Sequence, residues 1–178
     1  EFRNTCMSSL MALVEQPEED PRIRAGAANA IMHAAPKLGT DFLSSDKVMP
    51  FVKKLVNQPQ NPSEVTVKVL PHLAELIETL DSDGVQNFCK DVLLKMMNAD
   101  PQTGFDWRAR SAAAEALPVT ARQLQKSNIS PETFFEKNKV FDAFFELLND
   151  RVCNVREAAA LSIGELNTVL GTEWTTST

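Results

Sequence analysis

The sequence is short of the residues and motifs that mark many enzymes and membrane proteins. It has no tyrosine and no apolar run near the roughly 20 residues that a membrane-spanning helix needs. The clusters of β-branched and aromatic residues typical of strands are missing, which argues against a β-sheet protein. A Gly-rich phosphate loop, a nucleophile elbow and an HExxH motif are also absent. We therefore expect no enzymatic activity, no cofactor and no membrane association.

Charge and cysteine usage exclude further classes. A net charge of −6 and a pI near 5.0 argue against nucleic-acid phosphates as partners, because that binding requires clustered Lys and Arg. Cys6, Cys89 and Cys153 are widely spaced and form no CxxC motif, so we expect three buried thiols in the reducing cytoplasm or nucleus. His33 and His72 each lack a second His or a Cys at ligand spacing, so no metal site is expected.

One amphipathic pattern occurs three times along the chain. Apolar residues at steps of three and four lie on one face of a helix, and each copy also contains a run of small residues. Each first position is followed by an arginine, Arg24, Arg110 or Arg156, and Lys68 stands at the corresponding place between the first two. This recurrence predicts a repeat protein whose helix pairs stack on their neighbours. The three apolar faces are Ile23, Ala27, Ile31 and Leu38; Ala109, Ala113, Leu117 and Leu124; and Val155, Ala159, Ile163 and Leu170.

Start and stop signals divide the chain into eight predicted helices in four antiparallel pairs. The approximate repeats are 1–39, 40–81, 82–127 and 128–174. Prolines inside the fourth and sixth helices, Pro71 and Pro118, predict a kink and a bend. The predicted helices are 3–16, 21–38, 46–57, 62–80 and 83–98, a sixth after Asp106, a seventh from Pro131 and an eighth to Leu170, with N-caps at Asp20, Asn61, Ser82, Asp106 and Ser130.

Three segments resemble HEAT repeats: 20–24, 106–110 and 154–159. Within that family, these segments and 170–174 are most similar to the scaffold (A) subunit of protein phosphatase 2A and related regulatory subunits. The resemblance implies an all-α, right-handed α-solenoid. It also implies a ladder between turn aspartates and helix arginines, which here would be Asp20, Arg24, Asp106, Arg110 and Arg156. In the last repeat Val152 takes the aspartate place, with Asp150 displaced, and the second repeat offers Glu64 and Lys68.

The turns inside the repeats are the predicted partner-binding edge. Loops on a rigid framework commonly carry binding residues, and an exposed tryptophan is a strong anchor at interfaces. Trp107 either binds a partner or covers the end of the neighbouring repeat, whereas Trp174 is expected to pack on a following repeat of a longer chain. The ladder arginines either bind an acidic partner or bond to neighbouring carboxylates. The expected edge residues are Glu18, Arg22, Gln102, Trp107, Asn149 and Arg151.

By the same resemblance, the partner is a serine/threonine phosphatase catalytic or regulatory subunit, and a small-molecule ligand is not expected. Two other functions fit the pattern. The first is a tubulin-binding or transport-type HEAT array, which uses similar turns. The second is a structural spacer within a large helical protein, without a partner of its own.

Overall fold

The computed structural model describes residues 2–43, 48–57, 63–98, 107–171 and 174, and all regular secondary structure within these ranges is helical. The predicted all-α class is therefore confirmed.

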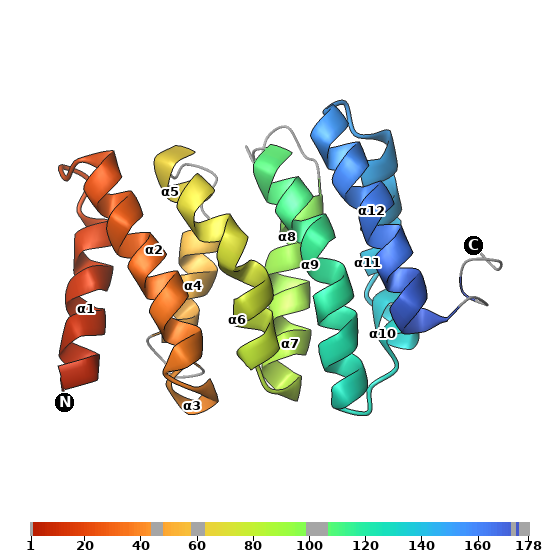
Figure 1. Cartoon of the computed structure of the whole chain (residues 1–178), viewed down its shortest axis with the longest axis horizontal. Helices are drawn as coiled ribbons and strands as arrows, with labels where there is room; N and C mark the ends of the chain where they lie inside the picture. The colour runs from red at the N-terminus through yellow and green to blue at the C-terminus, as the bar shows by residue number, and fades with distance from the viewer. Residues whose placement is uncertain (1, 44–47, 58–62, 99–106, 172–173, 175–178) are drawn as a thin grey trace.

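The helices follow one another along the long axis of the molecule in chain order, in two layers (Figure 1). No helix in the described ranges is both long and apolar enough to cross a bilayer. The layer nearer the viewer contains α2 (Pro21–Lys37), α5 (Ser63–Val69), α6 (Leu73–Thr79), α9 (Trp107–Lys126) and α12 (Cys153–Leu170), and the other contains α1 (Phe2–Glu15), α4 (Val48–Asn57), α7 (Ser82–Phe88), α8 (Leu94–Met97), α10 (Pro131–Lys137) and α11 (Val140–Glu146).

The first helix pair follows its sequence signals closely. The Asp20 carboxylate accepts a hydrogen bond from the Arg22 amide at 2.7 Å and caps α2, with Pro21 at the first helical position. Gly39, at φ +94°, ends the helix, because glycine enters this backbone region without steric cost. The segment that follows was expected to be a loop, but Thr40–Leu43 forms a short helix, α3. It is held by a hydrogen bond of 3.0 Å from the Thr40 hydroxyl to the Thr79 carbonyl.

Proline acts differently in the two helices that contain it. Pro71 lies in a 3₁₀ segment, η1 (Leu70–His72), which joins α5 to α6 and confirms the predicted kink. Pro118 lies inside α9, which continues unbroken to Lys126. The expected cap residues of these helices, Asn61 and Asp106, lie outside the described residues.

Several local features were not predicted. Residues Cys89–Leu93 form a π-helical segment, η2, between α7 and α8, and Asp81 rather than Ser82 caps α7. The predicted seventh helix is divided at Lys139, whose φ of +57° is left-handed, into α10 and α11. A short turn around Asn149 and Asp150 was expected before the eighth helix. The structure has a 3₁₀ segment there, η3 (Leu147–Asn149), and the helix begins at Cys153.

The core runs along the interface between the layers. The helices α9 and α12 pack against each other, and both contain small buried residues, with Ala113 and Ala159 fully buried. Ile23 was expected on the core face but is 49% exposed. Trp174 was expected to need a following repeat, yet it is buried within this chain, with its ring 5.3 Å from the ring of Phe141.

Candidate functional site

The predicted Asp–Arg ladder forms at one position with a different aspartate. The Arg110 guanidinium makes two hydrogen bonds to the Asp150 carboxylate, from Nε to Oδ2 at 2.6 Å and from Nη2 to Oδ1 at 3.2 Å. Both side chains are buried, and they join α9 to the turn before α12. The expected aspartate place of this repeat is held by Val152, and Asp150 had been described as displaced from it. The conformation of the turn makes Asp150 the partner of Arg110. The Asp150 carboxylate also accepts a hydrogen bond from the Val152 amide at 2.8 Å, which holds the carboxylate in place beside Arg110.

The other ladder residues bond to backbone. Arg24 donates from Nε to the Val14 carbonyl of α1 at 2.9 Å, while Asp20 caps α2. Arg156 donates to the Asp150 carbonyl at 2.7 Å. Of the three arginines, only Arg110 bonds to a neighbouring carboxylate, the structural alternative that the sequence left open, whereas Arg24 and Arg156 donate to backbone carbonyls. Asp106 lies outside the described residues.

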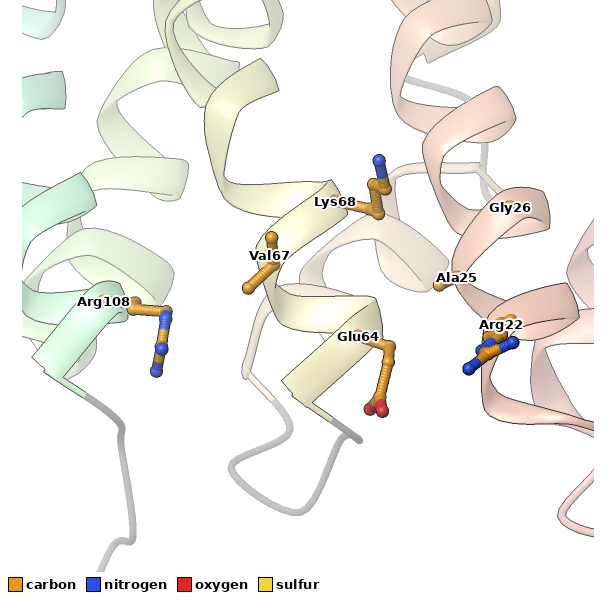
Figure 2. A pocket seen from close by; sticks show the side chains of 7 residues that line it. All are labelled: Arg22, Ala25, Gly26, Glu64, Val67, Lys68 and Arg108. Carbon is orange, nitrogen blue, oxygen red and sulfur yellow. The ribbon is translucent and has the colours of Figure 1, made fainter.

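An open groove of about 430 Å³ crosses three helices of the nearer layer (Figure 2). Ala25 and Gly26 of α2 line one side with small side chains. Val67 of α5 contributes an apolar side chain that is 47% exposed. Charged groups complete the lining, and these are Arg22 from α2, Glu64 and Lys68 from α5, and Arg108 from α9.

The groove is locally basic on an acidic chain. Three of its four charged residues are cationic, and the first turns of α2, α5 and α9 contribute the partial positive charge of helix N-termini. Arg108 also lies 4.5 Å from the ring centroid of Trp107, a cation–π geometry that holds both side chains at the start of α9. A concave surface of one charge sign concentrates ligands of the opposite sign. The groove can therefore accept an acidic segment that has an apolar side chain for Val67.

The structure places the predicted partner-binding residues unevenly around this groove. Arg22 lines the groove, and Trp107 adjoins it through Arg108 while half-buried against the core. Glu18, Asn149 and Arg151 are exposed outside the lining. Gln102 lies outside the described residues. Sequence reasoning gave no binding role to Val67 or Arg108, and it placed Lys68 in the ladder. The signal available in the sequence was an apolar residue, Val67, close to the charged residues Glu64 and Lys68.

Two other expectations are corrected. His33 and His72 are not isolated, because their ring centroids are 5.8 Å apart. Packing of α2 against the α5–α6 region brings together residues that no local spacing connects. Of the three cysteines expected to be buried, only Cys89 is, and Cys6 and Cys153 are exposed.

Comparisons of the chain with protein-family models, with curated proteins and with solved structures returned no match. The HEAT-repeat resemblance therefore remains a prediction that rests on the sequence motifs.

Proposed function

We propose that this chain is a protein-binding scaffold, built as a right-handed α-solenoid of about four HEAT-like repeats. The sequence recurrence and the order of helices along the long axis support this arrangement (Figure 1). The Arg110–Asp150 pair supports it further, because it joins the third predicted repeat to the fourth through a ladder arginine, with an aspartate two residues before the place that the family's aspartate would take.

The groove is the observation that carries the binding role. It spans residues of three proposed repeats, and it combines small side chains, one exposed valine and a positive rim. Its openness suits an extended or helical segment of another protein rather than an enclosed small molecule. The proposed occupant is an acidic segment of a partner protein. Its carboxylates would face Arg22, Lys68 and Arg108, and an apolar residue would cover Val67.

The resemblance extends this proposal to a particular partner. A serine/threonine phosphatase catalytic subunit would occupy the repeat edge, a regulatory subunit would bind elsewhere on the array, and the complex would be cytoplasmic or nuclear. The chain would act by holding these subunits in a fixed relation, without catalysis of its own.

Biolayer interferometry with a purified phosphatase catalytic subunit tests both levels of the proposal. Arg22→Glu and Lys68→Glu each place a carboxylate in the groove, and each is expected to weaken binding about tenfold, equivalent to about 1.4 kcal/mol. The matched control is Lys95→Glu, which makes the same charge change at an exposed position on α8, in the other layer. It should leave affinity unchanged.

The outcomes separate the alternatives. Binding that is equally weakened by all three variants would contradict the groove as the binding surface. Binding to purified tubulin or a transport cargo in place of the phosphatase would overturn the phosphatase assignment. Failure of the wild-type chain to bind any of these partners would favour the structural spacer.

A further inference from the structure

A cluster of metal-ligating side chains lies on the contact between the first two predicted repeats. It consists of His33 on α2, His72 in η1 and Glu75 on α6. These are the only two histidines of the chain, and the fold brings their rings to 5.8 Å at an interplanar angle of 65°. The cluster is separate from the groove, because none of its residues lines that surface.

The donor atoms are spaced for a small cation. One ligand atom from each residue lies within 4.8 Å of the other two, and His72 Nδ1 is 3.9 Å from Glu75 Oε2. Two ligands of a tetrahedral Zn²⁺ stand about 3.4 Å apart, given metal–ligand distances of about 2.0–2.2 Å. His33 is exposed and Glu75 is half-exposed, so small side-chain rotations can bring the ligand atoms from their present spacing to the spacing that Zn²⁺ needs.

The contact with Asn29 favours the His72 tautomer that leaves Nδ1 able to bind a metal. His72 Nε2 lies 3.0 Å from Asn29 Oδ1, and because a carbonyl oxygen only accepts hydrogen bonds, the Nε2 atom carries the proton. The lone pair is then on Nδ1, the atom nearest Glu75. A hydrogen bond from the distal ring nitrogen to an oxygen is the usual outer-shell support of a metal-bound histidine.

Lys37 now provides the positive charge at this cluster. Its ammonium Nζ lies 2.5 Å from His33 Nε2 and 4.0 Å from Glu75 Oε1. The Lys37 side chain is 53% exposed, so it can turn into solvent when a divalent cation takes its place. The cluster thus already holds a positive charge, and the Lys37 ammonium would compete with a metal ion for His33 and Glu75.

We propose that His33, His72 and Glu75 bind one Zn²⁺ ion, with water as the fourth ligand. Two imidazoles and one carboxylate suit this borderline metal, whereas Ca²⁺ and Mg²⁺ prefer all-oxygen sites. The bound ion links α2 to the η1–α6 segment and so restrains the first two repeats against each other. This inference does not depend on the proposed scaffold function.

Isothermal titration of ZnCl₂ into the 178-residue chain tests the site. The background is Cys6→Ser with Cys153→Ser, which removes the two exposed thiols as competing ligands. We expect one ion per chain and a higher Tm with Zn²⁺ than with Mg²⁺. His33→Gln and His72→Gln should each lower affinity at least tenfold, and Lys37→Gln should raise it. Glu78→Gln, one turn after Glu75 and exposed, is the matched control and should bind as the parent does.

A stoichiometry other than one, or affinity unchanged in His72→Gln, would overturn the proposal. If His72→Gln loses helix content by circular dichroism, Glu75→Gln gives the same test, because among the described residues its carboxylate makes only a 4.0 Å contact with the half-exposed Lys37 besides its contact with His72. Unchanged affinity in that variant would equally overturn the site. The visible spectrum of the Co²⁺-loaded chain adds an independent readout. Four-coordinate bands are expected, and a spectrum of hexaaqua Co²⁺ contradicts the geometry.

Discussion

Arg110 and Asp150, 40 residues apart in the sequence, form a buried ion pair that joins α9 to the turn before α12. Their side chains are 7% and 3% exposed. The guanidinium makes two hydrogen bonds to the carboxylate, and the carboxylate also accepts the Val152 amide at the start of α12. One interaction therefore fixes both the packing of α9 against the following turn and the direction in which α12 begins.

Removal of one member of this pair should strongly destabilise the fold. Arg110→Met leaves the Asp150 carboxylate buried without its counter-charge, and we expect a loss of about 3–5 kcal/mol in the free energy of unfolding, measured by urea denaturation. The matched control is Arg122→Met. Arg122 lies on the same helix and meets Glu165 at 3.7 Å with both side chains largely exposed, so its loss should cost less than about 1 kcal/mol. Equal losses in the two variants would contradict the assigned role.

Asp150 should also make stability depend on pH. Burial raises the pKa of this carboxyl, but the Arg110 and Val152 hydrogen bonds and the charges of Arg110 and Arg151 together lower it below its ordinary value of 3.8. Because the folded pKa is depressed, the stabilisation is complete above the unfolded value and is lost as pH falls through the folded pKa. The difference in unfolding free energy between wild type and Asp150→Asn should therefore be constant above about pH 5 and shrink below about pH 4. A constant difference down to about pH 2 would contradict this assignment.

The three cysteines should differ in reactivity. Burial raises the pKa of the Cys89 thiol from 9.0 to about 12, with a smaller opposing effect from the nearby Lys90 charge. Thiolate is the reactive form, so Cys89 should resist iodoacetamide in the native protein while exposed Cys6 and Cys153 are alkylated. Mass spectrometry should show two modified thiols under native conditions and three in denaturant. Cys89→Ala, which removes the buried thiol, should give two under both conditions.

Replacement of Lys139 by glycine should stabilise the protein. A non-glycine residue in the left-handed region costs roughly 1–2 kcal/mol, and the φ of Lys139 is +57°. Lys139→Gly removes this cost, offset in part by the greater freedom of glycine in the unfolded chain, for a net gain of about 0.5 kcal/mol or more. Asn128→Gly, at φ +59°, is the comparison, and its gain should be smaller because asparagine tolerates this region. Thermal unfolding of both variants measures the difference, and a loss of stability in Lys139→Gly would contradict it.

The groove can be filled without disturbing the fold. A Cβ atom at Gly26 would meet nothing within 4 Å, and the same holds for Gly164 on α12, outside the groove. Gly26→Gln and Gly164→Gln should each stabilise the helix that contains them by about 0.5–1 kcal/mol, because glycine is a poor helix former. Only Gly26→Gln should weaken binding of the partner in interferometry. Unchanged partner affinity in Gly26→Gln would place the partner elsewhere on the chain.

Local sequence signals specify the helices and most of their ends. Periodic apolar residues specified the helical class, and Asp20, Pro21, Gly39 and Ser130 marked boundaries correctly, because capping and proline effects act over only a few residues. The kink at Pro71 followed from the same local chemistry.

Contacts between residues far apart in the sequence depend on how the helices pack. The choice of Asp150 as the partner of Arg110 depends on the direction of a turn, and the burial of Trp174 on Phe141 depends on how the chain folds back after α12. The meeting of His33 with His72 and the shared groove of Arg22, Lys68 and Arg108 depend on the register between neighbouring helices. Register is set by packing of whole helix faces, a property of many side chains together that no short spacing in the sequence contains.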